Sequence, residues 1–376
     1  MLPLPLTAVF AELLDPRRET ENKLHALTDI LAIATCAVIG GAESWDGIAV
    51  FGRAKEPFFR RFLTLANGIP SPDTFERVFA KLDPKAFAAA FGRWLAAACE
   101  ATGLVVPIAI DGKSVRGAKK ATATGCLHLV SAWATDARLT LGQVSVPDGS
   151  NETAVVPELL ARLDLKGAVV TLDAAGCQKA IARQIRDQGG DYLLAVKGNQ
   201  PALRAAVERV FAGACEAGFE GTAYDGHESA GTGHGRREER YVTVIADPEG
   251  LPADWPDVAA VVQVNRERAV GDRTTSSTHY YVTSRRGTAA ELAGLIRGHW
   301  GIESMHWSLD VVYREDDSRV RAGHAGANLA MIRKVAVSLT RRAPGKQSGV
   351  TKRLKAGWDD GYLLQVLQGI PALVVR

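Results

Sequence analysis

The sequence predicts an α/β protein with a mixed β-sheet core, a helical region before that core and a β-rich insertion within it. Three observations support this prediction. Apolar residues recur at helical spacing through residues 1–103. From residue 104 onward, short runs rich in β-branched residues alternate with helical stretches, which favours a sheet covered by helices. Glycine then becomes dense between Gly213 and Gly235, and further β-like runs follow.

The N-terminal region reads as a series of helices. Leu24–Ile39 is a strongly apolar helix that ends at Gly40-Gly41, as helices often do. The apolar run within it is too short to span a bilayer, so we expect a buried helix and no membrane partner. Ser71 or Asp73 is expected to cap the next helix, and another begins at Asp83-Pro84.

The core is expected to hold strands at 104–110, 127–134, 139–146, 168–172 and 191–196, with helices at 152–163 and 177–188. Three strands, a helix, a strand, a helix and a strand in this order fit a ribonuclease-H-like mixed sheet. The insertion is expected to hold strands at 239–245, 258–265 and 275–283. The predicted domains are a helical N-terminal domain (1–103), the first part of the core (104–212), the β-rich insertion (213–285), the C-terminal core helices (286–344) and a basic tail (345–376).

The amino-acid composition indicates which broad class of protein this chain belongs to. The 376 residues include 47% hydrophobic and 23% charged residues, as in a soluble globular chain. The five cysteines form no C-x-x-C pair, so we expect reduced packing residues in a cytoplasmic protein and no zinc site. The start of the chain lacks the basic region of a signal peptide.

The net charge of +3 is unevenly distributed. Between Arg319 and Lys355 there are ten Lys or Arg and no Asp or Glu, which leaves 35 basic and 42 acidic residues elsewhere. A basic block on a mildly acidic body indicates a polyanion partner. A solvated helix face with a loose tail would give the same pattern.

Three carboxylates stand where they could share a metal site. Asp111 and Asp173 each end an expected strand, and Glu303 begins a helix near the C-terminus. Mg²⁺ prefers oxygen ligands, and two such ions can hold both the attacking and the leaving oxygen of a phosphoryl displacement. Each residue has a simpler explanation, because Asp often caps a turn and Glu is favoured in the first turn of any helix. The three carboxylates together therefore indicate a metal site more strongly than any one of them does alone.

The residues around these carboxylates resemble the DDE transposases of bacterial insertion sequences, specifically the ISAs-type group with the H-repeat-associated proteins. The resemblance runs over nearly the whole chain and rests on blocks that occur in the family's order. These blocks are His25–Ile33, Gly68–Phe75, Ala109–Lys113, His128–Trp133, Thr171–Ala174, Asp191–Gln200, Gly233–Arg236, His299–Glu303 and Arg314–Arg319.

The resemblance implies that Asp111, Asp173 and Glu303 are the catalytic, metal-binding triad. It also implies two Mg²⁺ ions, for which Mn²⁺ can substitute. The expected partner is double-stranded DNA, both the element's terminal inverted repeats and the target, with no nucleotide cofactor. The N-terminal helices are expected to bind the element ends, or alternatively to serve as a dimerisation platform. Because transposition joins two ends, we expect a homodimer in the active complex, in a cytoplasmic, nucleoid-associated bacterial protein.

One departure from the wider superfamily concerns the residues around the catalytic Glu. Where many relatives carry Tyr, Arg and Lys, this chain has Ile296, His299 and Asp310. Arg297 or His299 is expected to take over the phosphate contact. Asp310 lies two turns after Glu303 and is a candidate supporting carboxylate or alternative ligand.

Other residues are candidate DNA contacts because they flank the expected site. They lie beside Asp111, after the strand that follows Asp173, or around Glu303: Lys113, Arg116, Lys197, Asn199, Arg297, His299, Trp300 and His306. The bases could equally be ordinary surface residues. Of the two tryptophans near Glu303, Trp300 and Trp307, at least one is expected to pack in the core.

The sequence therefore predicts an enzyme that cuts DNA at element ends and joins them to a target. Two alternatives remain at this stage. One is a metal-dependent nuclease of the same fold that does not join strands. The other is a DNA-binding remnant without catalysis.

Overall fold

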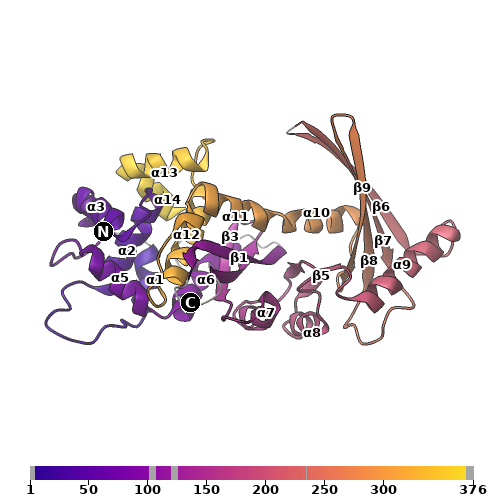
Figure 1. Cartoon of the computed structure of the whole chain (residues 1–376), viewed down its shortest axis with the longest axis horizontal. Coiled ribbons are helices and arrows are strands. Elements are labelled where there is room, and N and C mark those ends of the chain that lie inside the picture. Colours follow the sequence, from indigo (N-terminus) through magenta and orange to yellow (C-terminus); the bar gives the residue numbers. More distant parts are fainter. Residues whose placement is uncertain (1–4, 101–106, 120–125, 234, 370–376) are drawn as a thin grey trace. The chain divides into compact units, whose positions relative to one another are not determined.

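The computed structural model describes residues 5–100, 107–119, 126–233 and 235–369. The chain forms two compact units (Figure 1). The helical unit comprises Met1–Leu104, Gly112–Asn151 and Ile302–Arg376, and the sheet unit comprises Val105–Asp111 and Glu152–Gly301. None of the described helices is both long and apolar enough to cross a membrane.

The helical unit is built around two helices that are buried almost from end to end, α2 (Leu27–Ile39) and α12 (Ala325–Arg342). Around these two, the unit holds α1 (Pro5–Ala11), α3 (Trp45–Ala54), α4 (Glu56–Phe59), α5 (Pro72–Lys81), α6 (Pro84–Glu100), α11 (Gly301–Val311, from Ile302 onward), the short 3-10 helix η1 (Glu315–Asp317), α13 (Gly349–Trp358) and α14 (Asp360–Gln368). Ser71 caps α5 by accepting a hydrogen bond from the Thr74 amide, as its position in the sequence indicates.

Two antiparallel strands complete this unit, β2 (Cys126–Ala134) and β3 (Leu139–Ser145). Helix α6 packs directly on β3. A Cβ added at Gly92 would lie 2.3 Å from the Leu141 carbonyl oxygen, so only glycine allows this close approach. Strand β1 (Pro107–Lys119) continues from the sheet unit into the helical unit at Asp111.

The sheet unit begins with parallel pairing. The first residues of β1 pair with β4 (Val169–Leu172), and β4 pairs with β5 (Asp191–Val196). An antiparallel series follows, β9 (Arg273–Thr283), β8 (Ala260–Val270), β7 (Arg236–Ala246) and β6 (Tyr224–Gly233). The helices of this unit are α7 (Glu152–Leu160), α8 (Lys179–Asp187), α9 (Pro201–Glu216) and α10 (Ala289–His299).

The strand order β3-β2-β1-β4-β5, with parallel steps from β1 to β4 and from β4 to β5, is that of the ribonuclease-H-like fold and confirms the predicted fold class. The strands of the predicted insertion extend this sheet, because β9 pairs with β5 along Leu193–Val196.

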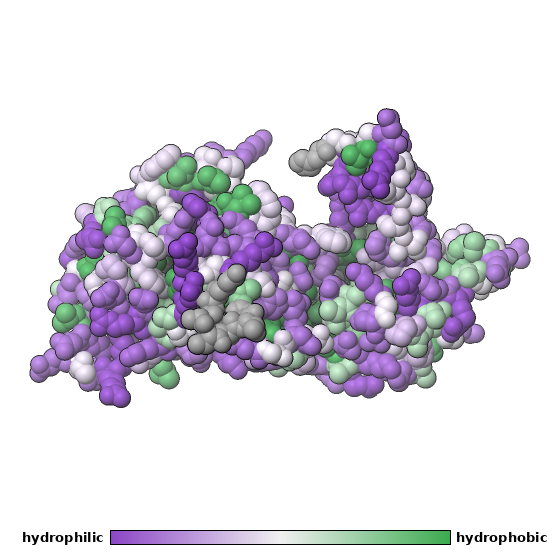
Figure 2. Space-filling view, in the orientation of Figure 1, coloured by the Kyte–Doolittle hydropathy of each residue, from purple (hydrophilic) through white to green (hydrophobic). Residues whose placement is uncertain are grey.

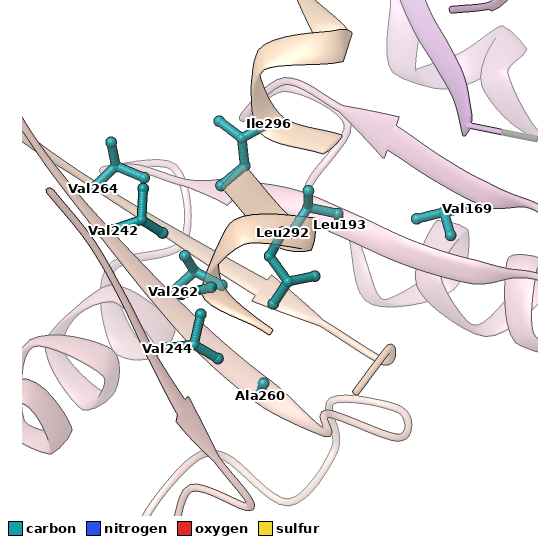
Figure 3. Close-up of a cluster of buried hydrophobic side chains, with 10 residues drawn as sticks. Val169, Leu193, Val242, Val244, Ala260, Val262, Val264, Leu292 and Ile296 are labelled. Atoms are coloured by element: carbon teal, nitrogen blue, oxygen red, sulfur yellow. The ribbon is translucent and has the colours of Figure 1, made fainter. Parts of the chain in front are cut away.

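Helix α10 covers one face of the extended sheet (Figure 3). Its Leu292 and Ile296 lie against valines of β7 and β8, and Val169 of β4 and Leu193 of β5 belong to the same buried cluster. The helix begins at a Thr288 capping box, and the Asp225 carboxylate of β6 accepts a hydrogen bond from its first amide at 2.7 Å. The C-terminal end of α10 is thereby fixed over β4, where the candidate site lies.

The structure corrects several expectations about individual elements. The strand expected to end at Asp111 runs on to Lys119, and residues 104–106 of the expected strand lie outside the described residues. The glycine-dense segment contains a strand, β6, that the sequence did not indicate. The residues expected to form a loose basic tail contain α13 and α14, which Ser348 and Asp359 cap by accepting hydrogen bonds from the Thr351 and Tyr362 amides.

Candidate functional site

Asp111 and Asp173 follow equivalent positions on neighbouring parallel strands. The last registered pair of β1 and β4 is Ile110 with Leu172, and each aspartate is the next residue. Neighbouring strands lie about 4.8 Å apart, and equivalent positions point to the same face. Sequence analysis expected these two carboxylates at one edge of the sheet, and the strand register brings the two positions together there.

Asp173 is an exposed carboxylate held by backbone amides. Its Oδ1 accepts hydrogen bonds from the amides of Ala175 at 2.9 Å and Gly176 at 3.3 Å. Gly176 has no room for a side chain, because a Cβ there would lie 2.6 Å from Leu172 Cδ2. The turn therefore fixes one carboxylate oxygen, while the side chain as a whole remains open to solvent.

His299, at the last position of α10, lies on the same face as Asp173. Its Nδ1 is 2.8 Å from the hydroxyl of Thr171, which is two residues before Asp173 on β4 and thus shares its face. Burial lowers the pKa of His299, and Asp173 and Thr171 offset this only in part. The side chain is thus a neutral, half-buried imidazole close to Asp173, and its bond to Thr171 fixes the ring.

The loop after β5 is tied to the loop after Asp173. Asn199 donates a hydrogen bond to the Ala174 carbonyl at 2.6 Å, and Gln200 donates to the Cys177 carbonyl at 2.9 Å. Lys197 in the same loop is exposed. The Asn199 amide thus holds these two loops together, and the exposed Asn199 and Lys197 remain candidate DNA contacts at this edge.

Glu303 lies in the first turn of α11, in the helical unit, and is exposed. The exposed fractions of Trp300 and Trp307, on either side of it in sequence, are 58% and 60%. The expectation that at least one of these tryptophans packs in the core is therefore wrong. Arg297, near the end of α10 in the sheet unit, is also exposed.

Lys113, two residues after Asp111 on β1, lies in a buried ionic cluster of the helical unit. Its Nζ is 2.6 Å from an Asp310 carboxylate oxygen, 3.2 Å from one of Asp316 and 3.4 Å from one of Glu315. Burial alone would lower its pKa, but the three carboxylates outweigh burial and raise it. The Lys113 ammonium is thus neutralised within the protein, although sequence analysis placed it among the DNA contacts.

Two further cations lie near Glu315. Lys334 is fully buried in α12, where burial lowers its pKa to about 8 although Glu315 acts in the opposite direction. The pKa of Arg333 is also lowered by burial and partly restored by Glu315. The carboxylates of Asp310, Glu315 and Asp316 are therefore balanced by Lys113, Arg333 and Lys334. Charged side chains away from water are stable only when they are balanced in this way.

Asp310 and His306 belong to this interior as well. Burial raises the pKa of Asp310, and its neighbouring carboxylates add to this effect against the attraction of Lys113. Burial, together with Lys334 and Lys113, lowers the pKa of His306 to about 3. Asp310 was a candidate supporting ligand and His306 a candidate DNA contact, but both side chains lie beside the lysines of this cluster.

The backbone around β1 explains how the cluster is held. The Arg116 amide donates to Asp316 Oδ1 at 3.1 Å, while the Arg116 side chain is 83% exposed. A Cβ at Gly117 would lie 2.5 Å from the Asp316 carbonyl oxygen. The turn at Glu315–Asp317 therefore docks directly on β1, and the exposed Arg116 guanidinium remains a candidate contact for DNA.

Asp111 and Asp173 fit a divalent cation on chemical grounds, because carboxylates on rigid neighbouring strands are hard oxygen donors. Within the described ranges, no group of three or more His, Cys, Asp and Glu side chains is gathered as for a metal ion. His234, in the glycine-rich Gly233–Arg236 block, lies outside the described residues.

Sequence analysis missed a cluster of arginines close to Arg297. The charges that act on Arg240 come from Glu238, Arg297, Arg266 and Arg236, all in the sheet unit. The unbroken run of charged residues Arg236–Arg240 was visible in the sequence. It could not be assigned to a face without the strand pairings.

Two family models match this chain. The model described as DDE_Tnp_1-associated matches residues 7–95, and the model described as Transposase DDE domain matches residues 106–339. The second match covers more than half of the chain and includes all three members of the expected triad.

Similar proteins that match over most of their own length support the same family assignment. The H repeat-associated protein YhhI of Escherichia coli (strain K12) is 36% identical over 94% of this chain and 95% of its own length. YncI of Escherichia coli O157:H7 is 38% identical over 96% of this chain and 94% of its own length. Both carry the word transposase in their names. An uncharacterized protein of Xanthobacter autotrophicus is 44% identical over 75% of this chain and 95% of its own length.

Among solved structures, a piggyBac transposase synaptic complex with hairpin DNA aligns with a TM-score of 0.40 and 9% identity, covering 97% of this chain and 78% of that one. That likeness is too low to support an argument about this chain. The family models and the full-length relatives agree with the residue blocks in the sequence. The chain belongs to the ISAs-type, H-repeat-associated group of DDE transposases.

Proposed function

We propose that this chain cuts DNA at the ends of an insertion sequence and joins the freed ends to target DNA, with Asp111, Asp173 and Glu303 as the catalytic, metal-binding residues. The observation that carries the proposal is the pair of aspartates after Ile110 and Leu172 on neighbouring parallel strands. Family membership supports a DNA-processing enzyme that uses divalent metal. Glu303 is proposed from its place in the His299–Glu303 block.

A divalent cation held by these carboxylates, Mg²⁺ or Mn²⁺, would polarise phosphate oxygens and make bound water more acidic. The protein's own contribution is positioning. The backbone amides of Ala175 and Gly176 hold one oxygen of Asp173, so its other oxygen has a defined direction. Thr171 holds the neutral imidazole of His299 beside that carboxylate, where the ring can donate a hydrogen bond to a phosphate oxygen without adding charge.

DNA contact is proposed for the exposed bases Lys197 and Arg297 of the sheet unit and for Arg116, which follows Asp111 on β1. The exposed indole of Trp300 is proposed as a surface on which a base could stack. We propose a homodimer in the active complex, because the reaction joins two element ends. The N-terminal helices are proposed to bind those ends.

A strand-transfer assay tests this proposal directly. The substrate is a labelled duplex carrying the DNA that borders the gene on one side, mixed with a supercoiled plasmid and Mg²⁺. We expect cleavage at the element end followed by label in the plasmid. Both products should disappear with EDTA or with Asp173→Asn, while DNA binding by that variant is retained.

The outcomes separate the alternatives. Cleavage without label in the plasmid would mean a nuclease that does not join strands. Binding by the wild type with no cleavage in Mg²⁺ or Mn²⁺ would mean a catalytically silent DNA-binding protein. Either result would contradict the proposed function.

A further inference from the structure

The outer half of the β6–β9 sheet presents arginines on one face. In antiparallel pairs, directly opposite residues point to the same side. Arg240 is paired with Arg266, Glu238 with Arg268, and Val270 with both Arg236 and Arg273. Since alternate residues of a strand share a face, all of these side chains lie on one side of the sheet. The arginine face is defined by Arg236, Arg240, Arg266, Arg268 and Arg273.

The opposite face of the same strands carries the reverse charge. Its charged residues are Glu228, Glu239, Glu267 and Arg237, which the strand register places together. One face thus holds five arginines and one glutamate, and the other holds one arginine and three glutamates. Strand propensity does not explain such a separation, because arginine and glutamate would serve equally well on either solvated face.

The arginine face continues the face of the sheet that carries Asp173. Val169, Thr171 and Asp173 alternate on β4, and Val169 belongs to the buried cluster under α10 together with Val242 and Val264. Arg240 and Arg266 are the next residues of the same face beyond these two valines. Helix α10 covers only the middle of this face, and its last residues, Arg297 and His299, lie between the arginines and Asp173.

A glutamate organises the centre of the arginine face. Glu238 is only 7% exposed and forms ion pairs with both Arg240 and Arg266. Burial lowers the pKa of Arg240, and Arg297, Arg266 and Arg236 act in the same direction against Glu238. One carboxylate cannot neutralise this many guanidinium groups, so the face keeps excess positive charge even at its centre. Arg236, Arg268 and Arg273 are exposed, and Figure 2 shows mainly hydrophilic residues over this outer part of the sheet.

The residues between the arginines select the kind of ligand. Apart from the exposed Val270, they are small or polar on this face: Ser229, Gly231, Gly233, Thr275 and Ser277. No aromatic side chain lies on the outer part of this face within β6–β9 as described, so it offers no surface for stacking unpaired bases. Guanidinium groups with open flanks suit phosphate oxygens. The arginines extend over about four residues of strand, roughly 13 Å, which is a substantial part of one turn of duplex.

We propose that the arginine face binds the phosphate backbone of double-stranded DNA next to the segment held at Asp111 and Asp173. The proposal rests on the proposed function, because it describes where the DNA duplex runs beyond the catalytic edge. The contact is independent of base sequence, because guanidinium groups directed at phosphates do not read base edges.

Binding of a mixed-sequence 40-base-pair duplex in EDTA, followed by fluorescence anisotropy at several salt concentrations, tests this proposal. The variant is Arg268→Gln combined with Arg273→Gln, two exposed residues away from the catalytic edge. We expect affinity to fall about tenfold or more near 0.1 M salt, and the slope of log K against log salt to fall by roughly two. The matched control is Arg237→Gln on the opposite face, which should stay within about twofold of the wild type.

The result distinguishes this surface from the catalytic proposal, because binding in EDTA does not require cleavage. An equal loss in the Arg237→Gln control, or no loss in the double variant, would overturn the arginine face as the contact. A wild type that fails to bind duplex in EDTA would overturn it as well. Selective loss in the double variant, in a protein that cleaves nothing with Mg²⁺, would support the surface and reject the proposed chemistry.

Discussion

Asp173 and Glu315 are both acidic side chains in blocks typical of this family, but the structure gives them opposite surroundings. Asp173 is exposed at the end of β4, and its Oδ1 accepts hydrogen bonds from two backbone amides. Glu315 is completely buried and lies near Lys113, Arg333 and Lys334. A carboxylate whose charge is balanced by buried bases holds the fold, whereas an exposed one on a rigid strand is available to a cation.

This difference also shows why acidic residues cannot be sorted by sequence context alone. Asp111 and Lys113 are two residues apart on β1 and share a face, yet Asp111 ends the sheet unit and Lys113 belongs to the ionic cluster of the helical unit. Both lie in the same Asp-Gly-Lys string. Lys113 joins the ionic cluster because of the turn at Glu315–Asp317, which comes roughly two hundred positions later in the chain.

The largest stability effect is expected at the buried glutamate. Glu315→Gln removes the charge that balances Lys113, Arg333 and Lys334 and should lower the free energy of unfolding by about 3–5 kcal/mol. Urea denaturation measures this loss. Asp173→Asn should change stability by less than about 0.5 kcal/mol, since it breaks no ion pair in the interior.

The control for Glu315 lies in the same turn. Asp317 is 65% exposed and pairs with the exposed Arg314 at 2.9 Å, so Asp317→Asn should cost less than about 1 kcal/mol. If Asp173→Asn destabilised the protein as much as Glu315→Gln, the contrast between an available and a structural carboxylate would fail.

A smaller effect is expected where β1 meets the turn. Gly117→Ala places a methyl group 2.5 Å from the Asp316 carbonyl oxygen and 2.6 Å from that of Ser318, so it should destabilise the protein by about 1–3 kcal/mol. Thermal denaturation measures the change. Gly213→Ala in α9, where nothing lies within 4 Å, should leave stability unchanged or raise it slightly. Equal behaviour of the two variants would mean that β1 and the turn are not closely packed.

A further effect concerns the pH dependence of the cluster. The pKa of Lys334 is about 8 in the folded protein and near 10.5 when the side chain is free. The unfolded chain therefore binds this proton more tightly, and the cost of keeping Lys334 charged in the interior is fully present below pH 8. That cost is relieved as the pH rises from 8 to 10.5.

We therefore expect the free energy of unfolding of the wild type, relative to Lys334→Met, to increase between pH 8 and pH 10.5. Denaturation of both proteins at three pH values across this window measures the difference, and the other lysines cancel in the comparison. A difference that stays constant or decreases with pH would contradict the low pKa.

The sequence predicted the structure correctly where the local residue pattern is enough to define an element and its ends. The run Asp191–Val196 reads as a buried strand and is one, and Asp111 and Asp173 follow apolar β runs whose parallel pairing puts them side by side. The caps at Ser71 and Thr288 also follow known sequence signals.

Prediction failed where a distant partner decides the structure. Tyr224–Gly233 has three glycines and little β propensity, and it forms a strand because β7 supplies its hydrogen bonds along the whole length. Likewise, nothing in the local sequence of Lys113, His306 and Asp310 shows that Glu315 or Lys334 acts on each of them. Helices α13 and α14 did have a local signal in their capping residues Ser348 and Asp359, which the basic composition of the segment obscured.

The central claim is that the Asp173 carboxylate binds the catalytic cation directly. The most direct measurement compares DNA-end cleavage by Asp173→Cys in Mg²⁺ and in Mn²⁺, since a thiolate binds the softer Mn²⁺ better than Mg²⁺. We expect the variant to lose cleavage in Mg²⁺ by roughly a thousandfold and to recover at least about tenfold in Mn²⁺, a loss of several kcal/mol of transition-state stabilisation that the softer ion partly restores. Cleavage at wild-type rate in Mg²⁺, or the same loss in both ions, would contradict direct binding of the cation by Asp173.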